Sequence, residues 1–311
     1  SVGRGPVGRT MRPVAAAGRI FFFYHWGGYC SEFDPALNTV SSKTANPSSF
    51  QYFEAFAPGD GKVHFLQRNG TGHQTYDIAT DSYSTAAVQP ITWASANAVA
   101  HNGKIYVLGG SAQRSRMDVY DTQTDSWSRV QDMLTTRYDG RAAKYNGKIW
   151  LFGGKLDPWT VEKSIEVYDL ENDTWSIYGN YEYGGSIKSV ASGHGRIYLL
   201  TNAAIEELNP ETGHWKRHRY PYNLDAEDLL NLGGSIFLVD NTHWNVNLKK
   251  YTPAMWAATV AGSVSNDSWE PKYITVDTDD ANRPSTYTFT AETKIEPGEE
   301  LRKLVADMKT E

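Results

Sequence analysis

The sequence predicts an all-β protein built from six copies of one short repeating unit. A first motif, a turn glycine followed by a short run of β-branched and aromatic residues, recurs along the whole chain. A second motif, an acidic or amide-containing turn followed by an aromatic residue, lies downstream of four of the copies. Such runs, bounded by glycine and polar turns, are typical of β-strands. Two motifs in a fixed order indicate a repeat architecture.

The first motif sets the length of the unit. Its leading glycines are 39 to 48 residues apart, and no copy is missing from the series. Each run is predicted to be a buried strand, the second of its unit, which begins after a glycine turn. The six copies are GRIFFFYH (18–25), GKVHFLQR (61–68), GKIYVLGG (103–110), GKIWLFGG (147–154), GRIYLLTN (195–202) and GSIFLVDN (234–241).

The second motif predicts a polar turn between an outgoing strand and an aromatic residue that begins the next strand. One unit cannot bury both of its faces alone, so large aromatic residues such as Trp127 and Trp175 are expected between neighbouring units. The four copies are YDIATDSY (76–83), YDTQTDSW (120–127), YDLENDTW (168–175) and LNPETGHW (208–215).

These two motifs at matched offsets resemble kelch repeats over residues 9–276. The resemblance implies a six-bladed β-propeller, in which each blade has four antiparallel strands, here called a to d from the central channel outward. Residues 277–311 are not kelch-like. They predict a turn-rich linker, a strand at 286–295 with period-two alternation, and an amphipathic helix at 296–309 that packs on the propeller.

The composition argues against several classes of function. The chain of 311 residues has no uninterrupted apolar run of about 18 residues, so no transmembrane span or membrane partner is expected. Its net charge of −6 argues against a nucleic-acid partner, which would need a basic surface. Cys30 is the only cysteine, which excludes an internal disulfide. P-loop, G-x-S-x-G, H-E-x-x-H and paired C-x-x-C motifs are missing, and neither a metal nor a cofactor is predicted.

The end of the first motif varies between units, and this variation suggests a site. Two copies end in a glycine pair, whereas the other four end in polar or aromatic residues. This can be drift in a degenerate repeat or a polar rim. In a propeller, the turns between strands b and c lie on the same face as the connections from strand d to the next strand a. We call it the b–c/d–a face, and it should collect the replaced residues and the residues that begin each inner strand.

The candidate ligand-binding residues lie on this face, chiefly where the last and first blades meet. They combine aromatic rings with both signs of charge, as small-molecule pockets and protein hot spots do. They are Arg12, Tyr24, His25, Trp26, Arg68, Lys188, Asp240, Asn241, His243 and Trp244.

Two extensions of the repeat are predicted on the same face. The last unit is the longest, and we favour an insertion at 241–256 as a loop; a competing register makes NLKKY (247–251) the third strand and leaves no long loop. A shorter extension at 155–164 carries Trp159 near its tip.

Three classes of function remain open from the sequence. The first is a module that binds a protein or small-molecule partner at the mouth of the channel. The alternative is a cofactor-independent enzyme, such as an isomerase, lyase or cyclase, because Glu54, Asp228, His25 and His243 offer the carboxylates and imidazoles that proton transfer needs. A lectin fits less well, because the rim residues differ between units.

Overall fold

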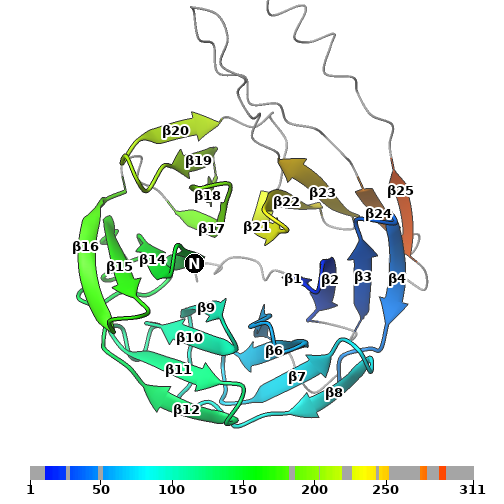
Figure 1. Cartoon of the computed structure of the whole chain (residues 1–311), viewed down its shortest axis with the longest axis horizontal. Coiled ribbons are helices and arrows are strands. Elements are labelled where there is room, and N and C mark those ends of the chain that lie inside the picture. Colours follow the sequence, from blue (N-terminus) through cyan, green and yellow to red (C-terminus); the bar gives the residue numbers. More distant parts are fainter. Residues whose placement is uncertain are drawn as a thin grey trace, which may run out of the picture.

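The protein is a ring of antiparallel sheets (Figure 1). The structure, a computed structural model, describes residues 11–25, 29–47, 52–181, 186–202, 204–218, 226–242, 245–251, 274–278 and 287–291. Within these residues six sheets surround a central channel, and five of them have four strands in the order a to d. The predicted all-β propeller is therefore confirmed. The described residues include no helix long and apolar enough to cross a membrane.

The strands follow the chain from the channel outward in each blade. In chain order they are β1 (Met11–Ala16), β2 (Arg19–Tyr24), β3 (Cys30–Asp34), β4 (Thr39–Lys43), β5 (Phe53–Phe56), β6 (Lys62–Gln67), β7 (His73–Asp77), β8 (Ser82–Thr85), β9 (Asn97–His101), β10 (Lys104–Leu108), β11 (Met117–Asp121), β12 (Ser126–Arg129), β13 (Arg141–Tyr145), β14 (Lys148–Phe152), β15 (Ser164–Asp169), β16 (Thr174–Asn180), β17 (Ile187–Gly193), β18 (Arg196–Thr201), β19 (Ile205–Leu208), β20 (Trp215–His218), β21 (Ala226–Leu232), β22 (Ser235–Thr242), β23 (Asn245–Tyr251), β24 (Ile274–Thr278) and β25 (Tyr287–Ala291).

The sixth blade differs from the favoured prediction. β23 pairs with β22 along its whole length, so NLKKY belongs to the third strand and the insertion expected at 241–256 is wrong. Direct pairing satisfies backbone N–H and C=O groups of β22 that a loop would leave open. β24 and β25 extend this sheet to five strands, and β25 falls within the stretch 286–295. The helix expected at 296–309 lies outside the described residues.

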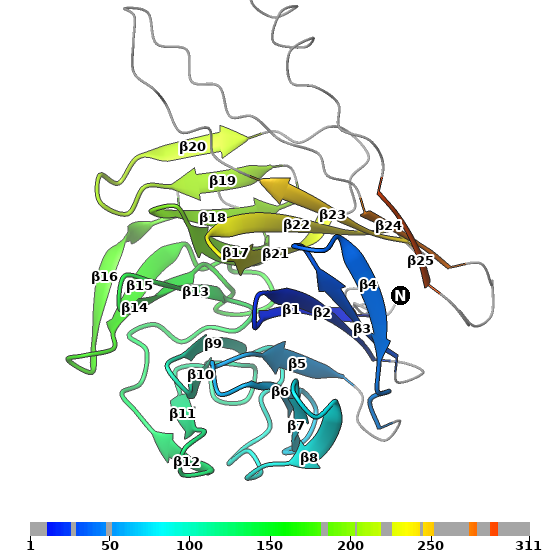
Figure 2. The ribbon, with the colours of Figure 1, turned by 45° about the vertical axis from the view of Figure 1, so that its right-hand side comes forward.

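Apolar clusters fill the junctions between neighbouring blades. Consecutive side chains of a strand point to opposite faces, and in β2 both faces are covered. Phe22 packs with Phe237 of blade 6, whereas Phe21 and Phe23 pack with Phe65 of blade 2. All three phenylalanines are therefore buried, as predicted for this run. The contact of blade 6 with blade 1 closes the ring (Figure 2).

The second motif forms one hydrogen-bonded turn that recurs in blades 2, 3 and 4. In blade 3, Asp125 has a positive φ of 46°, a conformation that Asp tolerates better than most residues. Its carboxylate accepts a hydrogen bond from the Tyr120 hydroxyl at 2.7 Å. The carboxylate of Asp121 accepts the Gln123 N–H at 2.9 Å and so caps the turn. The equivalent tyrosine–aspartate pairs are Tyr76–Asp81 and Tyr168–Asp173.

The same turn fastens each blade to the connection that precedes it. Asp125 also accepts the Ala87 N–H at 2.7 Å, and Trp127 Nε1 donates to the Ala87 carbonyl at 3.0 Å. In blade 4, Trp175 Nε1 donates to the Gln131 carbonyl at 3.0 Å. Trp175 is 8 % exposed in the core between blades 3 and 4, and Trp127 is half-buried between blades 2 and 3. The predicted role of both tryptophans between blades is confirmed.

Replacing Trp175 tests how much a junction contributes to stability. Trp175→Ala should lower the free energy of unfolding by about 3–5 kcal/mol, because it removes a buried indole. Trp159, which is 93 % exposed, is the matched control. Trp159→Ala should change the free energy of unfolding by less than about 0.5 kcal/mol. Urea denaturation followed by circular dichroism measures both. Equal effects at the two positions would contradict this role of the junction.

Candidate functional site

The register of the inner strands brings the predicted rim residues to one face. In blade 1, Met11 at the start of β1 pairs with Tyr24 at the end of β2. In blade 6, Ala226 at the start of β21 pairs with Asp240 near the end of β22. The residues that begin the inner strands and those that replace the glycine pairs therefore share the b–c/d–a face, as predicted. Trp26, His243 and Trp244 lie outside the described residues, so a site centred on blades 6 and 1 stays a prediction.

Four of the candidate residues meet at the junction of blades 1 and 2. Arg12 and Glu54 form a two-pronged ion pair, with Nε to Oε2 at 2.7 Å and Nη2 to Oε1 at 3.0 Å. Arg68 Nε lies 3.6 Å from Glu54 Oε1, and His25 lies beside this group. Arg12 is buried, so its pairing with Glu54 is a structural requirement as much as a feature of the rim.

His25 was expected as an exposed rim residue, but only 5 % of it is exposed. Its Nδ1 accepts the Phe53 N–H at 3.4 Å, and its ring packs on the Phe53 ring with centroids 4.5 Å apart. Burial and the charges of Arg12 and Arg68, opposed by Glu54, lower the pKa of His25 to about 3. His25 is therefore a neutral structural residue near pH 7 and a weak proton acceptor there.

One register position carries a polar side chain in every blade. In each inner strand, this residue pairs with the residue five places after the leading glycine of the first motif. We call this set the inner polar ring. Its members are Arg12, Glu54, Asn97, Arg141, Ser189 and Asp228.

The inner polar ring links neighbouring blades. Besides the Arg12–Glu54 pair, the side-chain oxygen Oδ1 of Asn97 in blade 3 accepts the Ala142 N–H of blade 4 at 2.9 Å. Arg141 Nε of blade 4 donates to the Lys188 carbonyl of blade 5 at 2.9 Å. The Ser189 hydroxyl of blade 5 donates to Asp228 Oδ1 of blade 6 at 2.5 Å. Asn97, Arg141 and Ser189 were not among the predicted site residues, although the constant offset of this position from the leading glycine identifies them.

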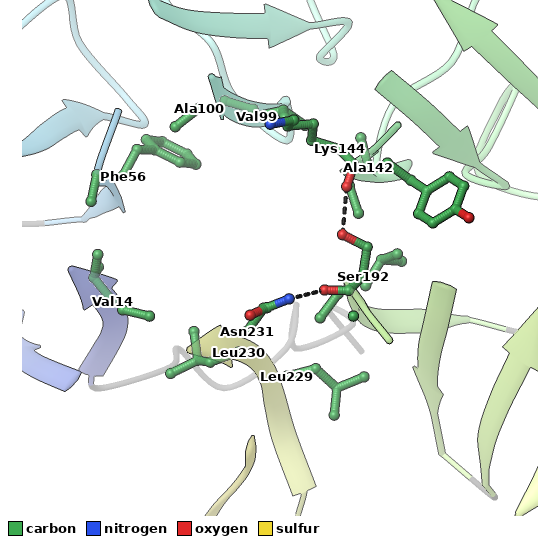
Figure 3. A pocket seen from close by; sticks show the side chains of 18 of the residues that line it. Val14, Phe56, Val99, Ala100, Ala142, Lys144, Ser192, Leu229, Leu230 and Asn231 are labelled. Carbon is green, nitrogen blue, oxygen red and sulfur yellow. Dashed lines mark hydrogen bonds between the residues drawn. The ribbon is translucent and has the colours of Figure 1, made fainter. Parts of the chain in front are cut away.

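The channel beside this ring is a cavity of about 550 Å³ whose walls are formed largely by small apolar side chains (Figure 3). Alanine, valine and leucine side chains of all six inner strands line it, for example Val14, Ala98 and Leu229. Around one side of the wall, the Asn231 amide donates to the Ser192 carbonyl, and the Ser192 hydroxyl donates to the Lys144 carbonyl at 2.5 Å.

The cavity does not unite the residues proposed for acid–base chemistry. Its lining, taken over the part of the chain that the structure describes, includes none of Glu54, Asp228 and His25. Glu54 and Asp228 instead accept the hydrogen bonds of the inner polar ring. In the same part of the chain, no group of three or more His, Cys, Asp and Glu side chains could hold a metal ion.

The extension at 155–164 is a braced loop on the b–c/d–a face. Lys155 pairs with Tyr138, in the connection that enters blade 4, and with Val161 across the loop. Asp157 Oδ1 accepts the N–H groups of Trp159 at 2.8 Å and Thr160 at 2.7 Å. This turn presents Trp159 to solvent with 93 % of its surface exposed. The loop also receives a hydrogen bond from blade 3, which Arg114 donates to the carbonyl of Leu156.

The burial of His25 predicts a pH dependence of stability. Its pKa of about 3 in the folded protein lies below the value of about 6.5 in an unfolded chain, so the stability it contributes is lost as pH falls from about 6.5 toward 3. His25→Asn places an amide oxygen near the position of Nδ1 and cannot titrate. Its melting temperature should therefore fall less between pH 7 and 4 than that of the wild type. Identical pH profiles would contradict this role.

Comparisons with known proteins agree with this architecture. Residues 92–134 and 136–180 match the model of the Kelch motif, and they cover blades 3 and 4, which keep the glycine pair. No curated protein sequence matches the chain significantly. The solved structure titled "Structure of YjhT" is similar, with a TM-score of 0.64 at 11 % sequence identity over 91 % of this chain and 97 % of that one. An identity this low shows a common fold only. The described part of the chain is thus a β-propeller of six sheets, whose third and fourth blades match the Kelch motif.

Proposed function

We propose that this propeller binds a protein partner on its b–c/d–a face and that the loop 155–164 is the anchor of the contact. The observation that carries the proposal is Trp159, an indole 93 % exposed at the tip of the loop. Val161 on the same loop and Leu134, in the connection to blade 4, are also exposed. Tryptophan is enriched among the residues that dominate the energy of protein interfaces.

The rigidity of the loop supports a role in binding. The Asp157 turn, the Lys155 bridges and the Arg114 hydrogen bond hold the backbone that carries Trp159. A preformed loop loses less conformational entropy when a partner binds, so more of the contact energy becomes affinity. A loop that served only as a connection would need neither this bracing nor an exposed indole.

The hydrogen bonds of the inner polar ring favour binding over proton transfer. Glu54 and Asp228 hold neighbouring blades together, and His25 is buried and neutral. The rim retains Arg68, whose side chain is more than a third exposed, and Tyr52, which is also exposed. Both can contribute to the edge of an interface, where the contacts of charged residues affect association rate more than affinity.

Site-specific photo-crosslinking tests the proposal. A benzophenone amino acid replaces Trp159 in one variant and Leu37 in another, and both are irradiated in extracts of the source cells. Leu37 is a matched control, because it is exposed but lies in the turn between β3 and β4, away from the loop. We expect one polypeptide to be crosslinked to the propeller, at a constant ratio of partner to propeller, through position 159 and not through position 37. The same products from both positions, or none, would contradict the proposal.

Trp159→Ala should weaken binding of the crosslinked partner at least tenfold, about 1.4 kcal/mol, because it removes the anchor. Leu37→Ala should leave the dissociation constant unchanged. Isothermal titration calorimetry measures both. The thermal unfolding of the two variants should match that of the wild type, which separates lost contact from lost structure. Unchanged affinity of the Trp159 variant would show that the anchor lies elsewhere on the face.

A further inference from the structure

A series of hydrogen bonds through two buried histidines of blade 2 lies at its junction with blade 3, where the histidine rings contact Tyr120 and Trp127. Asp60 Oδ2 lies 2.9 Å from Nε2 of His64, whose Nδ1 lies 2.9 Å from Nε2 of His73. Nδ1 of His73 in turn lies 3.1 Å from the carbonyl oxygen of Ala87. Both imidazoles are almost completely buried. None of these residues belongs to the inner polar ring or to the loop 155–164.

The acceptors at the two ends of this series of hydrogen bonds determine how many protons the two histidines must carry. A carboxylate and a carbonyl oxygen only accept hydrogen bonds, so both terminal contacts require an N–H on the histidine. The central contact between the two rings requires a third N–H. A neutral imidazole carries one N–H, so two neutral histidines supply only two protons for three hydrogen bonds.

We propose that the folded protein binds one extra proton on the His64–His73 pair and that this proton fastens the junction of blades 2 and 3. With three protons, every contact in the chain is a hydrogen bond. With only two protons, one of the three contacts has no proton, and two hydrogen-bond acceptors face each other in the core, which is strongly unfavourable. The junction is then a proton-dependent fastening.

The carboxylate of Asp60, 2.9 Å from Nε2 of His64, is the negative charge at the end of these hydrogen bonds that favours the extra proton. Burial and the charge of His64 lower the pKa of His73 to about 4, while the Ala87 carbonyl and the carboxylates of Asp125 and Asp60 oppose this shift. The hydrogen bond and charge of His64 also lower the pKa of Asp60, although burial acts to raise it. Tyr120, whose ring packs on both histidines, donates its hydroxyl proton to Asp125 and stays neutral.

The series of hydrogen bonds ends at the carbonyl oxygen of Ala87, which also takes part in the contact between blades 2 and 3. The Ala87 carbonyl also accepts the Trp127 indole N–H, and the Ala87 N–H donates to Asp125. Loss of the extra proton therefore loosens the connection from blade 2 at the point where it meets blade 3.

The direction of the pH dependence follows from linkage. Unfolded histidines titrate near pH 6.5. Above that pH the unfolded chain loses protons while the folded pair retains its extra one, so stability decreases as pH rises. One proton allows a decrease of up to about tenfold in the folding equilibrium constant between pH 6.5 and 8. Cys30, whose pKa is raised by burial, stays a thiol in the folded protein over this range.

Asp60→Asn is the decisive variant, because an amide can donate to His64 where the carboxylate can only accept. The amide proton replaces the missing third proton, and all three hydrogen bonds form with neutral histidines. Urea unfolding of the full chain should show stability decreasing from pH 6.5 to 8 in the wild type. In Asp60→Asn it should increase slightly, because the folded histidines hold no extra proton while the unfolded ones still lose theirs. The matched control is Asp132→Asn, which removes a carboxylate from an exposed ion pair with Arg129 and should keep the wild-type slope.

A second measurement on the wild type covers the case in which a variant fails to fold. Nitrogen-15 spectra of the histidine rings at pH 7.5 should show one imidazole protonated on both nitrogens and coupled to a second, neutral ring. Two neutral rings at this pH would overturn the proposal. A wild-type slope retained in Asp60→Asn would also overturn it, because the slope would then arise from groups outside these hydrogen bonds.

Discussion

The packing of each blade against its two neighbours is the constraint on which this structure depends. A four-stranded sheet with two apolar faces cannot exist alone in water, so every blade is stable only within the closed ring. Strand β2 illustrates this, because Phe22 faces one neighbour while Phe21 and Phe23 face the other. The constraint explains why buried strands read as continuous apolar runs instead of alternating patterns. It also explains why polar residues at the junctions form hydrogen bonds between neighbouring blades.

These fastenings lie at two radii of the ring. On the outside, the tyrosine–aspartate turns and their tryptophans attach blades 3 and 4 to the connections before them. Around the channel, the inner polar ring joins the first strands of neighbouring blades. Residues that a sequence reader would assign to a site, such as Arg12 and Asp228, are therefore partly accounted for by the ring itself. The exposed indole of Trp159 has no such structural explanation, and this is why it carries the proposed function.

The sequence predicts the repeat, its strands and the face on which polar residues gather, because turn glycines and apolar runs depend on local backbone and burial rules. It does not reveal that His25 is buried, since its burial depends on Phe53 in the next blade. The sixth blade was misread because its spacing is compatible with both a loop and a paired strand, and only the pairing of β22 with β23 decides between them. The inner polar ring could have been found from its constant offset to the leading glycine. The proton count of the His64–His73 pair could not, because it depends on distances between side chains.

A double-mutant cycle on Arg12 and Glu54 tests most directly whether the channel mouth is built for fastening. The variants Arg12→Met, Glu54→Gln and their combination are compared by equilibrium unfolding at pH 7. We predict that Glu54→Gln costs about 3–5 kcal/mol, because it leaves the buried guanidinium of Arg12 without its carboxylate. Arg12→Met should cost less, because Arg68 still lies 3.6 Å from Glu54. The double variant should lose much less than the sum, with a coupling of about 1–3 kcal/mol. Small, additive effects would contradict this prediction and would leave both residues available to a ligand.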